Sequence, residues 1–415
     1  MSESIDLAPL LREGDCIAWG GAAAEPAVLL EALSAALPRS PACTGFANLG
    51  TTTALDPAAV AGRMRIKALG GAGTNRRFQE VGALDVLPMH YSALPDLVRD
   101  GRFPIDVVLM MLATDGGRLG FGAQIDYLAD ALARARVVVA EVNDQAPVTF
   151  GEMDVPVADI DHVIGVSHPL PQMRTATPGP VETAIGAHVA RLVPDGATLQ
   201  VGLGVLPDAV LMALRSKRDL GIHSGTIGDR VADLMEAGVI TNRRKPIDAG
   251  LAVTAGLLGT DRVYRFGHKN PALFLRSPRY THDNMVHAQI DGLIGINTAL
   301  EVDLTGQMNA EVAGGRHLGM VGGHADFMRG CLRARDGKGI VAMEATARGG
   351  TLSRIVPKLA DGVVTTSRSD ADIVVTEHGV AELRGRSVSE RARALVAIAD
   401  PRFRPGLEAA AERLM

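Results

Sequence analysis

Two glycine motifs could present backbone amides to a ligand. Gly322 and Gly323 stand side by side directly before His324, and paired glycine N–H groups can stabilise the oxyanion of a tetrahedral thioester intermediate. The unperturbed imidazole of His324 would titrate near neutral pH. Gly202 and Gly204 lie where an apolar strand turns into a helix, and without β-carbons they let a ligand approach the backbone closely. An ordinary turn explains Gly202 and Gly204 equally well, and for Gly322 and Gly323 it is the simpler explanation.

Two glutamates form a third candidate group. Glu301 and Glu344 lie in or just after apolar, strand-like runs. Burial beside such runs removes water from a carboxyl group, which raises its pKa towards the range of a general base. A structural alternative exists for Glu344, because Arg348 and Arg354 are close enough in the sequence to form an ion pair with it.

The elements that would position these residues alternate between short apolar strands and amphipathic helices. Residues 104–111 and 137–142 are predicted strands, and residues 125–134 are a predicted helix between them. Continuous apolar strands separated by helices indicate an α/β fold with parallel strands covered on both faces. Ligands in such folds bind at the carboxyl ends of the strands.

The length of 415 residues predicts more than one domain, because single hydrophobic cores rarely grow that large. Prolines are concentrated between residues 169 and 180, where neither helix nor strand accommodates them well. We therefore predict one α/β domain over residues 1–175 and a second over residues 181–415. The second carries most of the candidate residues.

Composition excludes several classes of function. Hydrophobic residues make up 47% and charged residues 21%, which is typical of a soluble globular protein. The net charge of −5 with interspersed signs argues against nucleic acid as a partner. We expect no signal peptide, because residues 1–13 lack its basic and apolar regions, and no membrane span, because no run of 18 residues is apolar. Cys16, Cys43 and Cys331 are scattered without metal or redox spacing, so we expect no metal site and a cytoplasmic location.

Several ordered segments resemble the acetyl-CoA hydrolase/4-hydroxybutyrate CoA-transferase family. The resemblance covers nearly the whole chain and is densest after residue 185. It is carried by residues 140–147, 195–211, 296–307, 321–327 and 375–379.

The resemblance implies two open, mostly parallel α/β CoA-transferase-like domains with the active site at their interface. Family members move coenzyme A between an acyl-CoA and a small carboxylate, with no metal, and are often homodimers. A glutamate carboxylate attacks the thioester and holds its energy as an enzyme-bound intermediate. The resemblance also implies that Gly322 and Gly323 stabilise the oxyanion, and that the turn at Gly202 and Gly204 binds beside the thioester.

The sequence departs from the family at the position of that glutamate. Gly225 follows His223 and Ser224 where the family carries its nucleophile, although Asp229 and the helix after it match the downstream pattern. His324 replaces a usual glutamine. Glu344 stands where proline is common.

Three explanations follow from a missing nucleophile. Glu344 or Glu301 could supply a replacement carboxylate and retain CoA transfer, which we take as the expected reaction. Alternatively, His324, Glu344 or Asp229 could activate water in a thioesterase. The protein could also bind acyl-CoA without turnover.

Three arginines could recognise a carboxylate or the phosphates of CoA, although a role as surface residues is the simpler interpretation. They are Arg77, Arg265 and Arg368.

Overall fold

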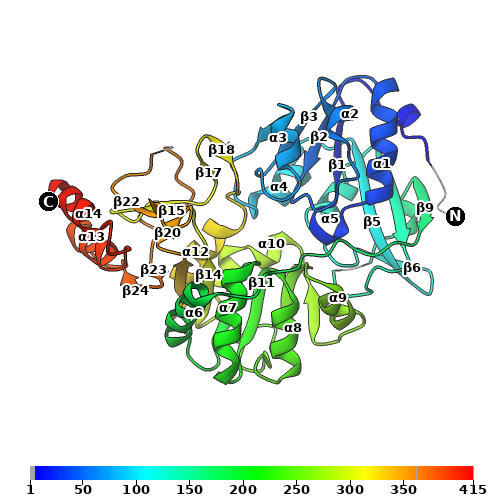
Figure 1. Cartoon of the computed structure of the whole chain (residues 1–415). Coiled ribbons are helices and arrows are strands. Elements are labelled where there is room, and N and C mark those ends of the chain that lie inside the picture. Colours follow the sequence, from blue (N-terminus) through cyan, green and yellow to red (C-terminus); the bar gives the residue numbers. More distant parts are fainter. Residues whose placement is uncertain (1–4, 153, 361, 415) are drawn as a thin grey trace. The chain divides into compact units, whose positions relative to one another are not determined.

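The computed structural model describes residues 5–152, 154–360 and 362–414, which divide into two α/β units (Figure 1). The first unit comprises the chain up to Met173 together with Val253–Thr281 and His317–Met320. The second comprises Arg174–Ala252, His282–Arg316 and the chain from Val321 onward. The α/β class predicted from the sequence is confirmed. The sequence predicted a division between residues 175 and 181, and the structure adds two later segments to the first unit.

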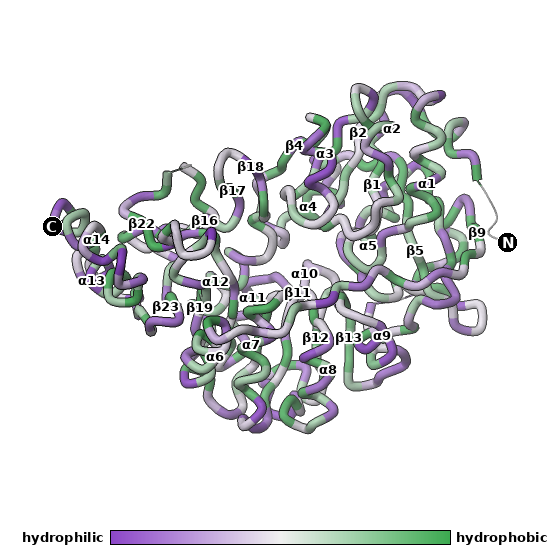
Figure 2. Tube along the Cα trace, viewed as in Figure 1, coloured by the Kyte–Doolittle hydropathy of each residue, from purple (hydrophilic) through white to green (hydrophobic). Residues whose placement is uncertain are grey.

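The first unit is built on a parallel sheet with the strand order β4-β3-β2-β1-β5-β7-β9. The interior strand β5 is buried from Val107 to Ala113, because every side chain in that run is apolar. Figure 2 shows the apolar colouring along β5. The strands of this sheet are β1 (Cys16–Trp19), β2 (Cys43–Ala47), β3 (Met64–Ala68), β4 (Leu84–Val86), β5 (Val107–Asp115), β7 (Val137–Asn143) and β9 (His162–Val166), with β6 (Arg118–Gly120) antiparallel to β5.

The remaining elements of the first unit are helices and two later strands. Strand β13 pairs in parallel with β8. The elements are α1 (Ala27–Ala36), α2 (Pro57–Val60), α3 (Arg76–Glu80), α4 (Ala93–Arg99), α5 (Leu128–Leu132), α9 (Asp261–Gly267), α10 (Pro278–Thr281), β8 (Phe150–Gly151) and β13 (Leu273–Leu275), and β12 (Ala252–Leu257) begins at the boundary with the second unit.

The second unit contains the strand order β24-β23-β19-β14-β10-β11, parallel apart from β24. These strands are β10 (Thr198–Val201), β11 (Gly221–Ile227), β14 (Leu293–Asn297), β19 (Lys338–Ala342), β23 (Ile373–Thr376) and β24 (Gly379–Glu382). Its helices are α6 (Pro180–Leu192), α7 (Val205–Ala213), α8 (Asp229–Glu236), α11 (Asn284–His287), α12 (His324–Arg333), α13 (Val388–Ala397) and α14 (Arg404–Ala411). Short strands include β15 (Glu301–Asp303), β16 (Met308–Asn309), β20 (Thr346–Ala347), β21 (Leu352–Ser353) and β22 (Ile355–Val356).

Local sequence patterns predicted the strands more accurately than one of the helices. The strand predicted at 137–142 corresponds to β7, and the strand predicted at 104–111 to β5, which begins at Val107. The helix predicted over 125–134 is restricted to α5, Leu128–Leu132. Asp126 explains the difference, because its φ of +56° lies in the left-handed region and cannot belong to a right-handed helix. No helix among the described residues is long and apolar enough to cross a membrane.

Candidate active site

A pocket in the second unit lies where three adjacent parallel strands end. Strands β19, β14 and β10 are neighbours in the sheet, and the residues that follow each of them line the same cavity, as the α/β rule for ligand sites predicts. We call this cavity, of about 250 Å³, the Gly204 pocket. It is lined by Leu203–Pro207, Thr298–Leu300, Ala310, Ala342–Glu344 and Arg354.

The turn from β10 into α7 contributes one wall of the pocket. Gly204 is the N-cap of α7 with φ +124°, a conformation that residues with a β-carbon rarely adopt. A β-carbon built there would meet no atom within 4 Å, so the backbone is open to a ligand. Gly202 does not line the pocket, and its N–H donates to the carbonyl of Ile296 at 3.3 Å. Of the two predicted glycines, Gly204 is therefore the one placed to contact a ligand in this cavity.

The two candidate glutamates have different surroundings. Glu344 follows β19 and lines the Gly204 pocket together with Arg354. Among the described residues, Glu344 forms no ion pair with Arg348 or Arg354, so the structural alternative predicted for Glu344 is not formed. Glu301 is the first residue of β15, and its carboxylate accepts a 3.0 Å hydrogen bond from the Asn309 side chain. Glu344 is therefore the better placed of the two to meet a ligand.

The strand that carries Gly225 is fixed by side chains on both sides. The Ser224 hydroxyl donates to the carbonyl of Val201 at 3.2 Å and accepts from its N–H at 3.3 Å, which ties β11 to the end of β10. The buried Lys245 ammonium donates to the carbonyls of Ile222 and Leu251 at 2.9 and 2.8 Å. Burial lowers the pKa of Lys245 to about 8. The backbone at Gly225 is thus held in a defined position.

An imidazole, not a carboxylate, lies against Gly225. A β-carbon built at Gly225 would be 3.1 Å from both Cε1 and Nε2 of His282. Among the residues the structure describes, and apart from the chain neighbours of Gly225, no other group comes within 4 Å of that point. Sequence analysis did not identify His282, because it stands in no motif and its proximity to β11 arises only from the tertiary fold.

The loop of Gly322 and Gly323 leads into α12. Gly322 has φ +49°, and Gly323 is the N-cap of the helix. The next N–H along the chain, of His324, donates to the carbonyl of Val321 at 3.2 Å. Backbone N–H groups at a helix N-terminus can hold an oxyanion. The predicted role of these glycines is therefore compatible with their geometry and remains a prediction.

His324 is the first residue of α12 and is almost fully buried, with 8% of its surface exposed. Its Nε2 atom is buried without a hydrogen-bond partner among the described residues. Burial lowers the pKa of His324 to about 4, so the ring is neutral at pH 7 and does not titrate near neutrality as the sequence suggested. The neutral ring is therefore a weak base in the resting protein.

Histidines and an aromatic ring pack around the start of α12. The Phe327 ring stacks on His287 with centroids 4.6 Å apart and contacts His282 at 4.9 Å. His287 in turn meets His223 edge-on at 5.5 Å. The described residues include no group of three or more His, Cys, Asp or Glu that could hold a metal ion. The sequence made His223 look isolated, whereas the fold brings it next to His287.

The remaining predicted residues lie away from the Gly204 pocket lining. Asp229 is the first residue of α8, directly after β11 and Gly228. Arg77 donates to the carbonyl of Thr53 at 3.2 Å in the first unit. Arg265 and Arg368 are exposed. The arginine in the pocket is Arg354, which the sequence analysis considered only as a partner for Glu344.

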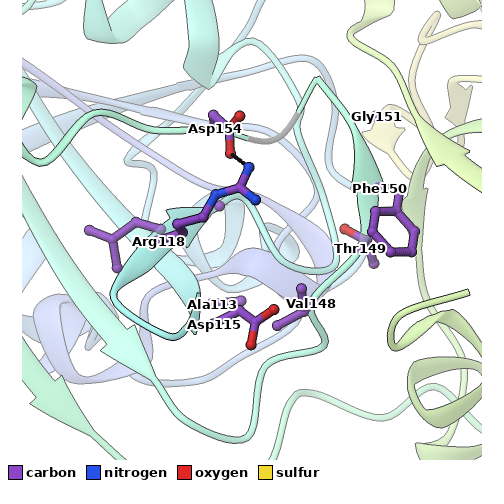
Figure 3. Close-up of a pocket in the computed structure, with 10 residues that line it drawn as sticks. Ala113, Asp115, Arg118, Val148, Thr149, Phe150, Gly151 and Asp154 are labelled. Carbon is purple, nitrogen blue, oxygen red and sulfur yellow. Dashed lines mark hydrogen bonds and ion pairs between the residues drawn. The ribbon is translucent and has the colours of Figure 1, made fainter.

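A different pocket, in the first unit, has matched charges (Figure 3). Arg118 pairs with Asp154 at 2.5 Å across it, and Asp115 pairs with Lys269 at 2.9 Å. None of the site residues predicted from the sequence lines it. Its arginine is already engaged, so the Gly204 pocket is the stronger candidate for an anionic thioester substrate.

Comparison with known proteins identifies the family of this chain. Residues 1–169 match the acetyl-CoA hydrolase/transferase N-terminal domain, and residues 259–411 match the corresponding C-terminal domain. The 4-hydroxybutyrate coenzyme A transferase of Clostridium kluyveri is 42% identical over 346 residues, which cover 83% of this chain and 81% of that protein.

Two solved structures are similar along almost the whole chain. RipA from Yersinia pestis superposes with a TM-score of 0.92 at 32% identity, covering 99% of this chain and 96% of RipA. The 4-hydroxybutyrate CoA-transferase from Porphyromonas gingivalis superposes with a TM-score of 0.84 at 34% identity, covering 99% and 97%. The family's two domain models match both halves of the sequence, and the fold matches that of a 4-hydroxybutyrate CoA-transferase. This chain therefore belongs to the acetyl-CoA hydrolase/transferase family.

Proposed function

We propose that the protein binds acyl-CoA and transfers coenzyme A from it to a small carboxylate by a mechanism that does not use residue 225. The observation that carries this proposal is the carboxylate of Glu344 in the Gly204 pocket, opposite a glycine turn that leaves the backbone open. A cavity of about 250 Å³ is smaller than most complete ligand sites, which begin at about 300 Å³. It therefore suits the thioester end of the substrate and not the whole of CoA.

The proposed chemistry conserves the thioester energy on Glu344. Its carboxylate oxygen attacks the thioester carbonyl carbon, the C–S bond breaks, and a mixed anhydride and CoA thiolate form. The thiolate then attacks the glutamyl carbonyl and releases the first acid, which leaves a glutamyl-CoA thioester. The acceptor carboxylate reverses these two steps and departs as the new acyl-CoA. Arg354, on the same cavity wall, supplies a positive charge for the acceptor carboxylate.

Replacing Glu344 by glutamine is expected to lower CoA exchange at least about 1,000-fold, because an amide cannot form the covalent intermediate. Glu301→Gln is the matched control, since Glu301 is already bonded to Asn309 and an amide oxygen can still accept that bond. The measurement is mass-spectrometric analysis of acyl-CoA products with a panel of acyl-CoAs and carboxylates. Equal exchange by the native protein and Glu344→Gln would remove Glu344 from the mechanism.

A further inference from the structure

The edge of the His282 ring that carries Nε2 faces two backbone positions at once. At Gly225 a β-carbon would lie 3.1 Å from Nε2, and at Gly323 it would lie 2.5 Å from Nε2 and 2.6 Å from Cδ2. Any side chain at Gly323 would therefore collide with the ring. The imidazole thus sits between the position where the family carries its nucleophile and the loop predicted to hold the oxyanion.

The ring is fixed in this position by packing. His282 is only 3% exposed, and its ring contacts Phe327 at an angle of 60°. On its carboxyl-terminal side, Asp283 caps α11 by accepting from the N–H of Met285 at 2.8 Å. Gly225 itself is partly buried. A base held in a fixed position is a requirement of general-base catalysis.

The protonation state suits a proton acceptor. Burial, with a smaller contribution from the nearby His287, lowers the pKa of His282 to about 3, so the ring is neutral at pH 7. Such a ring is a weak base in the resting protein. Negative charge that develops on a thioester oxygen next to it would stabilise the imidazolium, so proton transfer becomes favourable as the bond to carbon forms.

We propose that His282 takes the functional place of the missing glutamate as a general base, and that the protein hydrolyses bound acyl-CoA when no acceptor is present. This inference rests on the proposed function only in requiring that acyl-CoA is bound. Nε2 of His282 takes a proton from water while the water oxygen bonds to the thioester carbonyl carbon. The oxyanion faces the N–H groups of Gly322 and Gly323. The C–S bond then breaks, the imidazolium returns the proton to the CoA thiolate, and the free acid and CoA leave.

The test compares His282→Asn with His162→Asn, a matched substitution of an exposed histidine in β9. Free CoA release without acceptor, CoA exchange with acceptor, and CoA binding by calorimetry are measured for each. We expect His282→Asn to lower CoA release at least about 100-fold while CoA binding and Glu344-dependent exchange persist. CoA release by His282→Asn within twofold of the native protein would overturn the inference.

A second variant separates a lost base from a lost fold. His282→Gly leaves a cavity of imidazole shape, and added imidazole is expected to restore CoA release in proportion to its concentration. A folded His282→Gly protein without rescue would contradict the role of base. If the native chain shows exchange but its CoA release does not depend on His282, only this inference fails. If it shows neither exchange nor release with any acyl-CoA, the proposed function fails as well.

Discussion

CoA exchange that is lost in Glu344→Gln is expected to return when Gly225→Glu and His282→Ala are added together, and not when Gly225→Glu is added alone. The reason is steric. The first atom of a new side chain at Gly225 would already be 3.1 Å from two atoms of the His282 ring, closer than ordinary van der Waals contact at about 3.5–4.0 Å. The carboxylate needs the room beyond that point, which the ring occupies. Alanine at position 282 provides that room.

The expected gain from the paired substitution is about 100-fold or more in exchange over the Glu344→Gln background, because a restored covalent nucleophile is worth several orders of magnitude. Products are followed by mass spectrometry with the same acyl-CoA and carboxylate panel. His282→Ala without Gly225→Glu is the control for the cavity alone. Full exchange from Gly225→Glu without any change at His282 would show that the ring moves aside easily, and would disprove the steric argument.

Acid is expected to weaken the second unit through two of its buried imidazoles. The pKa values of His282 and His324 are lowered to about 3 and about 4, against about 6.5 in an unfolded chain. Between these values the unfolded chain binds more protons, so the free energy of unfolding falls as the pH drops below about 6.5. At pH 5 each histidine accounts for about 2 kcal/mol of lost stability, since one pKa unit is worth about 1.4 kcal/mol.

The single tryptophan allows the two units to be followed separately. Trp19 lies buried in the first unit, where burial raises the pKa of Glu25 and of Asp126. Those two shifts have the opposite sign and favour the folded state in acid. On going from pH 7.5 to pH 5, urea midpoints measured by circular dichroism should fall more than those measured by Trp19 fluorescence. His282→Asn and His324→Gln should each reduce that fall, and an unchanged fall in both variants would refute the assignment.

Sequence patterns predicted the scaffold of the site because those patterns are local. The apolar strand and the helix predicted on either side of Gly202 and Gly204 correspond to β10 and α7, and the glycine turn between them lines a pocket at the strand end. The structures of apolar strands and glycine turns are determined largely by a few neighbouring residues, so they can be predicted from short stretches of sequence. The expected location of the ligand at strand ends follows from the same local reasoning.

What the sequence could not supply was the contact between distant segments. His282 follows a short helix and stands in no chemical motif, yet the fold brings its ring against Gly225 and Gly323. Burial, which shifts the pKa of both His282 and His324 far from the ordinary value, is also a property of the assembled core. Even Glu344 and Glu301, which are similar in sequence context, differ only once the partner Asn309 of Glu301 is placed.

Because of the contact between Gly225 and His282, a single substitution is not expected to restore carboxylate chemistry at position 225. A glutamate at position 225 meets the ring, and the loss of the ring alone leaves neither an imidazole nor a carboxylate at that point. Each one-step route back to carboxylate chemistry at position 225 therefore passes through a variant with an impaired site. Because the His282 ring packs against this glycine, positions 225 and 282 must change together before carboxylate chemistry at position 225 can return. These positions are well separated in the sequence, so that return requires two independent mutations.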